Sequence, residues 1–117
     1  MIEELRNYCL GKKYVSESFP FDESTLVFKV HNKMFALTSL EQDPLRMNLK
    51  CEPEKAIELR EEFWQVIPGY HSNKKHWNTI IIDGLSLKQV QEWIDHSYQL
   101  VWDKLPRKIK NQYKKLL

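Results

Sequence analysis

The sequence predicts a two-layer α+β domain in which helices pack on one face of an antiparallel sheet. Three observations predict this fold class. Segments with alternating apolar residues follow one another between residues 25 and 51. The turns that join them are too short for a crossover helix, so neighbouring strands must run antiparallel. Segments with apolar residues at helical spacing lie before and after them. The predicted order is α-β-β-β-α-β-α-α, in one domain that spans residues 1–117.

The chain begins with a predicted helix over residues 2–10, where apolar side chains recur every three or four positions. The next segment, residues 15–22, is predicted to be a loop, because its proline keeps the preceding residue extended. We expect Phe19 and Phe21 to anchor this loop by packing against the core.

Three strands are predicted next. Residues 25–31 and 34–40 alternate on either side of Asn32, which predicts a hairpin with a tight turn. Residues 45–51 alternate as cleanly, so this third strand turns its apolar side chains toward the core. Its other face must then carry three polar side chains, Arg46, Asn48 and Lys50.

The second half of the chain is predicted to be mainly helical. A helix opens at Glu52-Pro53-Glu54, with proline in the first turn and acidic residues near the positive end of the helix dipole. A β-branched strand over residues 79–83 follows a long connector, residues 68–79. Ser86-Leu87-Lys88-Gln89 has the form of a capping box that starts a long helix, and Pro106 starts a basic one.

The charge is small overall but unevenly distributed. The chain has a formal net charge of +2, with 42% hydrophobic and 29% charged residues, as in ordinary soluble domains. No apolar run approaches the roughly 20 residues that cross a bilayer, and the N-terminus lacks the pattern of a signal peptide. We therefore expect a cytoplasmic protein without a membrane partner. After Asp103 the charged residues are all basic: Lys104, Arg107, Lys108, Lys110, Lys114 and Lys115.

Neither a metal site nor a cofactor site is predicted. Cys9 and Cys51 lie far apart without a CxxC spacing, which favours small buried side chains over a disulfide or a catalytic thiol. His71 and His76 are five positions apart, whereas a helical zinc site places its histidines four apart. With three glycines in the whole chain, no phosphate-binding glycine loop is present.

The connector is the strongest candidate for function, because its side chains donate hydrogen bonds, carry charge or stack. Together with the outward-facing residues of the third strand, the connector would form one surface. On that surface lysines would contact phosphates, and asparagine amides would contact base edges. Arg46 would read a base or a phosphate with its forked guanidinium. Trp77 would stack on an unpaired base, with a core position as the alternative, and Asn73 would alternatively cap its own turn. The predicted nucleic-acid-binding residues are Arg46, Lys50, His71, Asn73, Lys74, Lys75, His76 and Trp77.

The chain resembles the MmcQ/YjbR family of small bacterial proteins, and the resemblance runs nearly end to end. It rests on Tyr8-Cys9-Leu10, Phe19-Pro20-Phe21, Lys33-Met34-Phe35-Ala36-Leu37, Leu49-Lys50-Cys51-Glu52-Pro53-Glu54, the connector from Gly69 to Thr79, and Ser97-Tyr98-Gln99-Leu100-Val101. The resemblance implies a fold similar to that of secretion chaperones and frataxin-like proteins. It also implies DNA as a partner, bound in a double-wing mode. The modest net charge predicts weak, salt-sensitive binding.

Two other classes of function stay open. A chaperone-like module would bind a protein partner through exposed aromatic side chains, for which Trp93 and Trp102 are candidates; partial burial of Trp93 against the last helix is the simpler expectation. A small-molecule-binding enzyme would gather its polar groups into one pocket. The candidates for that pocket are His71, His76, Ser97 and Tyr98, but no nucleophile motif surrounds the serine.

Overall fold

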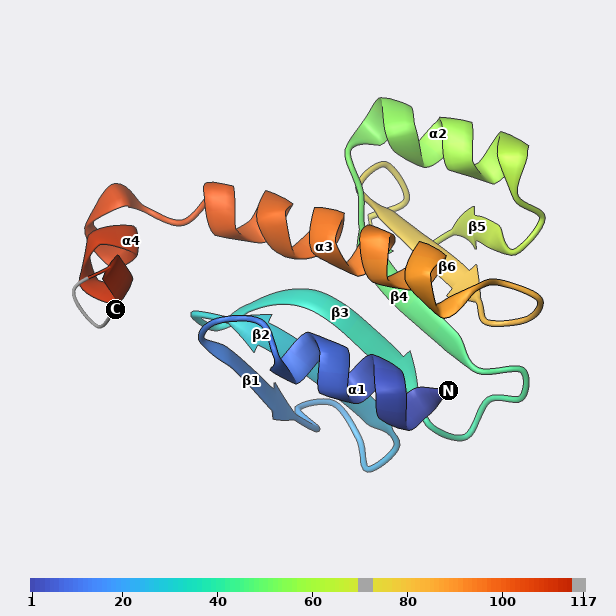
Figure 1. Ribbon diagram of the computed structural model, residues 1–117, viewed down its shortest axis with the longest axis horizontal. Helices are drawn as coiled ribbons and strands as arrows, with labels where there is room; N and C mark the ends of the chain where they lie inside the picture. The colour runs from blue at the N-terminus through green and yellow to red at the C-terminus, as the bar shows by residue number, and fades with distance from the viewer. Residues whose placement is uncertain (70–72, 115–117) are drawn as a thin grey trace.

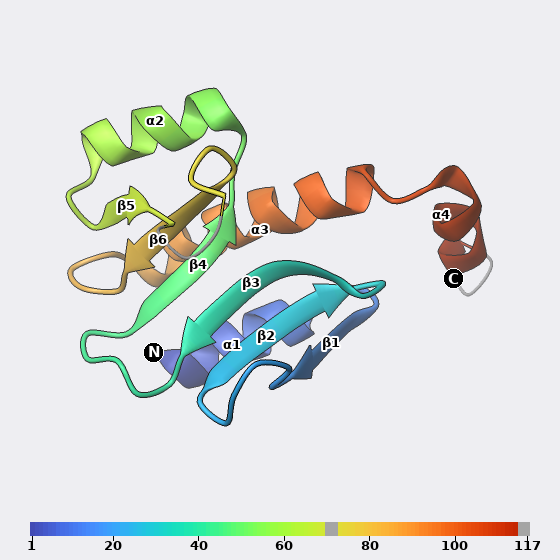
Figure 2. The same ribbon diagram turned by 180° about the vertical axis from the view of Figure 1, so that it is seen from behind.

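The computed structural model describes residues 1–69 and 73–114. Its elements are α1 (Ile2–Leu10), β1 (Val15–Ser18), β2 (Thr25–Val30), β3 (Lys33–Ser39), β4 (Arg46–Lys50), α2 (Pro53–Glu62), β5 (Val66–Pro68), β6 (Trp77–Ile81), α3 (Leu87–Asp103) and α4 (Arg107–Lys114). The strands form one antiparallel sheet in the order β1-β2-β3-β4-β6-β5. Helices α1 and α3 cover one face of it, and α4 stands apart at the end of the longest axis (Figure 1). Figure 2 shows the opposite face, which no helix of the described residues covers.

The predicted fold class is confirmed, with two strands added. The helices and the four predicted strands follow in the expected order, but β1 and β5 also join the sheet as its two edges. Both are short, and β5 ends at Pro68, a residue that edge strands tolerate because one side of the strand needs no donor. The segment after β1 also differs from expectation. Phe19 and Phe21 are 47% and 64% exposed, so they do not pack against the core.

The tight turn that was predicted at Asn32 joins β2 to β3. His31 and Asn32 both have positive φ angles, 47° and 60°, as the type I′ turn of a two-residue hairpin requires. The alternation of β4 is also confirmed. Met47 and Leu49 are buried, while the outward row of Arg46, Asn48 and Lys50 is half-buried.

Helix α3 supplies the largest part of the helical layer. Its buried stripe is formed by Val90, Trp93, Ile94, Ser97 and Val101, and its first turn is capped by the Ser86 hydroxyl, which accepts from the Gln89 N–H at 3.1 Å. Trp93 is 5% exposed and meets the ring edge of Phe63, at the end of α2, with centroids 5.1 Å apart. The expectation that Trp93 packs on the last helix was wrong, because α2 lies nearer to it.

A single hydroxyl joins α3 to the two central strands. The last paired residues of β3 and β4 are Ala36 and Leu49, and beyond them the strands separate. Ser97 fills this gap: its Oγ accepts from the Lys50 N–H at 2.9 Å and donates to the Phe35 carbonyl. Ser97 itself is fully buried. The hydroxyl therefore replaces a missing rung of the ladder and fixes the position of the helix on the sheet.

Both cysteines are buried and free, as the dispersed spacing predicted. Burial raises the pKa of the Cys9 thiol to about 12, which leaves it protonated and unreactive at neutral pH.

No helix in residues 1–69 and 73–114 has the length and apolar character needed to cross a membrane.

Ser97→Ala should lower the free energy of unfolding by about 1–3 kcal/mol, because two buried backbone groups lose their partner. Urea denaturation measures this loss. Ser16→Ala is the matched control, since Ser16 is exposed on the edge strand β1 and its loss should cost less than about 0.5 kcal/mol. Equal stability of the two variants would contradict the role assigned to Ser97.

Candidate nucleic-acid interface

The structure divides the predicted cations between two ends of strand β4. Lys50 ends the strand, in register with Trp77, and lies next to the turn over residues 73–76. The Cys51 N–H donates to the His76 carbonyl at 2.7 Å, which joins that turn to the end of β4. Arg46 begins the strand, in register with Ile81, about 13 Å away by the rise of a strand. Arg46 and Lys50 therefore do not form one phosphate-binding cluster.

The turn is ordered by its own asparagine and by an arginine from α2. The Asn73 side chain accepts from the Lys75 N–H at 3.0 Å, and its carbonyl accepts from the backbone N–H groups of His76 and Trp77. Arg60 donates to the Lys74 carbonyl and, at 2.7 Å, to the Asn78 side chain. Asn73 thus has the local capping role that was its alternative. Lys74 and Lys75 are exposed and His76 is half-buried; His71 lies outside the described residues.

Trp77 is buried, with 8% of its surface exposed. A Cβ added at Gly69 would lie 3.0 Å from the Trp77 Cβ, so the two backbones approach closely at this point. Trp77 therefore packs in the core, which was the alternative to stacking on a base. Its ring is not presented to solvent.

The charges of two other lysines act on Lys50 at the end of β4. Burial lowers the pKa of Lys50, and the neighbouring charges of Lys104 and Lys33 lower it further. These residues come from the end of β4, the C-cap of α3 and the start of β3. Among the described residues the ion pairs join Met1 to Glu4, Arg6 to Glu17 and Lys12 to Asp95. Within that part of the chain, none of the three lysines forms an ion pair.

Helix α4 adds four cations beyond the C-cap of α3 (Figure 1). It has no buried residues, and its cations are Arg107, Lys108, Lys110 and Lys114. Lys110 Nζ donates to the Asp103 carbonyl at 2.7 Å, which ties the start of α4 to the end of α3. We call this region the basic end: Lys33, Lys50, Lys74, Lys75, Lys104 and the four cations of α4.

A cluster of rings that the sequence did not reveal holds α4 in place. Tyr14 stacks on Tyr113 with centroids 4.3 Å apart, and its hydroxyl donates to the Tyr113 carbonyl at 2.7 Å. His31 Nδ1 lies 2.9 Å from the Tyr113 hydroxyl, and Trp102 contacts both tyrosines. The cluster draws on four separate segments of the chain, which is why no local pattern predicted it. Trp102 is half-buried within it, and so is not a free aromatic side chain for a partner.

The residues of the enzyme alternative have structural partners instead. Ser97 is enclosed between β3 and β4, and the Tyr98 hydroxyl donates to the Lys13 carbonyl at 2.7 Å. The His76 backbone belongs to the turn that joins the end of β4. No group of three histidine, cysteine or acidic side chains within residues 1–69 and 73–114 could hold a metal ion.

His96 joins α3 to the beginning of α2. Its Nε2 accepts from the Glu52 N–H at 3.2 Å, a bond that requires the neutral ring. Burial lowers the pKa of His96 and the charge of Lys55 lowers it further, while the Glu52 carboxylate opposes the shift. The hydrogen bond from the Glu52 N–H to His96 also helps to fix the backbone next to Lys50, which lies just before Glu52 in the chain.

Protonation of His96 should make stability depend on pH. As pH falls, the unfolded chain binds its proton first, near the ordinary pKa of 6.5, and the folded protein only later. The free energy of unfolding should therefore fall through this window. His96→Gln should reduce that slope, because Gln keeps an acceptor that does not titrate. Urea denaturation at about pH 7.5 and about pH 5.5 measures it; identical slopes would show that His96 has no such role.

Known proteins match this chain over most of its length. The family model described as YjbR matches residues 10–100. The uncharacterized protein YjbR of Escherichia coli (strain K12) is 35% identical over 106 residues, which are 90% of each chain. The uncharacterized protein YbdF of Escherichia coli O157:H7 is 31% identical over 107 residues, 91% of this chain and 88% of that one.

Two solved structures share the fold. The Deinococcus radiodurans protein DR2400, described as a DUF419 domain, superposes with a TM-score of 0.92 at 40% identity, over 97% of this chain and 88% of that one. A protein from Pseudomonas syringae superposes with a TM-score of 0.73 at 25% identity, over 85% of this chain and 97% of that one. The family match, the identities and the shared fold agree, and the chain belongs to the YjbR family.

Proposed function

We propose that the protein binds nucleic acid weakly, through phosphate contacts at the basic end. The observation that carries the proposal is that the charges of Lys33 and Lys104 act on Lys50, while none of the three lysines forms an ion pair within the described residues. Placing like charges together costs free energy, which an anionic ligand that bridges them would recover. The DNA expectation from the family resemblance agrees with this chemistry.

The geometry supports contacts to the phosphate backbone more than readout of base sequence. The cations are mostly lysines, which act as point charges, and Arg46 lies at the other end of β4. Helix α4 adds a row of cations that could follow a backbone beyond the end of the sheet (Figure 1). A net charge of +2 limits the number of phosphates that the protein neutralises. Binding should thus be weak and sensitive to salt.

Lys104→Gln should weaken binding, and the slope of log affinity against log salt should become shallower by roughly 0.7–0.9, because one phosphate fewer is neutralised. Lys88→Gln is the matched control, because Lys88 is an exposed lysine in the first turn of the same helix, at its opposite end. Fluorescence anisotropy with labelled duplex and single-stranded DNA, at low salt and at about 0.15 M, measures both.

A Lys33→Gln/Lys50→Gln/Lys104→Gln variant should reduce the slope by the amount expected for roughly two to three phosphates. Its melting temperature, compared with that of the unmodified protein, separates weaker binding from impaired folding. An absence of binding at low salt, or equal effects of Lys88→Gln and Lys104→Gln, would contradict the proposal.

A protein partner is the second candidate function. It is favoured by Ile57 and Trp64, large apolar side chains of α2 and the segment just after it that are 53% and 66% exposed. Trp64 fluorescence would report a partner at this surface, and its emission should not respond to DNA bound at the basic end.

A further inference from the structure

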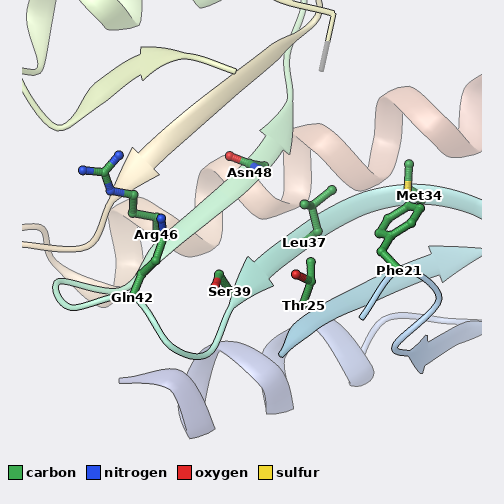
Figure 3. A pocket seen from close by; sticks show the side chains of 8 residues that line it. All are labelled: Phe21, Thr25, Met34, Leu37, Ser39, Gln42, Arg46 and Asn48. Carbon is green, nitrogen blue, oxygen red and sulfur yellow. The ribbon is translucent and has the colours of Figure 1, made fainter. Parts of the chain in front are cut away.

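A groove lies on the uncovered face of the sheet. Its volume is about 400 Å³, within the range of small-molecule sites. Its lining residues are Phe21, Thr25, Met34, Leu37, Ser39, Gln42, Arg46 and Asn48. Figure 3 shows Phe21 and Met34 together at one end, Arg46 and Gln42 at the other, and Leu37 between them. The groove therefore has an apolar end, and its other end is formed by Arg46, whose guanidinium lies at the outer rim beside β6 in Figure 3.

Arg46 has no partner for its charge within the described chain. It is half-buried, and its side chain takes part in none of the ion pairs or side-chain hydrogen bonds of residues 1–69 and 73–114. A guanidinium presents five donors in a planar fork that matches a carboxylate. Since no side chain of the described residues pairs with it, the Arg46 guanidinium is available to bind an acid from outside.

The apolar end is built by an ordered turn. The Asp22 carboxylate accepts from the backbone N–H groups of Ser24, at 2.9 Å, and Thr25, at 2.6 Å, and from the Thr25 hydroxyl. This turn holds the neighbouring Phe21 beside the sheet, where it is 64% exposed. The Asp22 carboxylate places a negative charge beside Thr25, a residue of the groove lining, and its hydrogen bonds lower its pKa. An anionic group would avoid this charge and turn toward Arg46.

We infer that this groove binds a small amphipathic organic acid, with its acid group on Arg46 and its apolar body against Leu37, Met34 and Phe21. Arg46 accounts for the acid group, the groove volume limits the ligand to a small molecule, and the exposed Phe21 accounts for the apolar body. This site is independent of the proposed nucleic-acid interface, because it shares none of the residues of the basic end.

Decanoate is a suitable probe, with decan-1-ol as its neutral analogue, and isothermal titration calorimetry measures both. Decanoate should bind more tightly than decan-1-ol, and Arg46→Gln should weaken decanoate binding roughly tenfold, because a charge-assisted bidentate pair is removed. Arg107→Gln is the matched control, since Arg107 is an exposed arginine of α4. Phe21→Ala should weaken both ligands several-fold, whereas Ile57→Ala, at an exposed apolar residue of α2, should not.

Unchanged melting temperatures would show that these variants fold. Failure of decanoate to bind would overturn the inference, as would equal losses in Arg46→Gln and Arg107→Gln. Decanoate binding that Arg46→Gln does not weaken would place the acid elsewhere and would also overturn it. None of these results bears on DNA binding, which is measured separately with the Lys104→Gln and Lys88→Gln variants.

Discussion

The hydroxyl of Ser97 is the constraint on which most of this structure depends. It lies where β3 and β4 separate, bonds to one backbone group of each, and belongs to the helix that spans the sheet. Without this hydroxyl, two buried backbone groups would be left unsatisfied, at a cost of about 1–3 kcal/mol. The Ser97 hydrogen bonds also set the geometry of the basic end. They hold the Lys50 backbone directly, and they position α3 so that Lys104, at the C-cap, comes near Lys50 and Lys33.

The two candidate sites lie in different parts of the structure, one from the end of β4 to α4 and the other in the groove on the open face of the sheet. On the covered side, the ring cluster of Tyr14, Trp102 and Tyr113 anchors a helix that is otherwise basic and unburied. On the open side, no helix of the described residues packs against Leu37 and its neighbours, which leaves a groove (Figures 2 and 3). A long, multiply charged anion suits the basic end, and a small acid with an apolar body suits the groove.

The fold class and most elements could be predicted from the sequence, because their signals are local. The alternation around Met47 and Leu49, the Ser86 cap and the turn at Asn32 each act within a few residues. The edge strands were missed because β1 and β5 are too short to show a period. Phe19-Pro20-Phe21 was assigned to the core because aromatic residues usually are buried, whereas Phe19 and Phe21 are exposed here.

The candidate site was harder to predict, since alternation gives the face of a strand but not the distance between sites along it. Arg46 and Lys50 share a face yet belong to different surfaces, and Trp77 is buried although it lies in the polar connector. Lys33 was not predicted, and Lys104 was predicted only as part of the basic C-terminal run, because only the tertiary fold brings their charges to act on Lys50. The most direct test of nucleic-acid binding at the basic end is a nitrogen-15 NMR titration with a short single-stranded oligonucleotide at low salt. We expect shifts at Lys33, Lys50, Lys104 and α4, with Leu37 and Ser39 unmoved; shifts centred on the open sheet face would contradict this assignment.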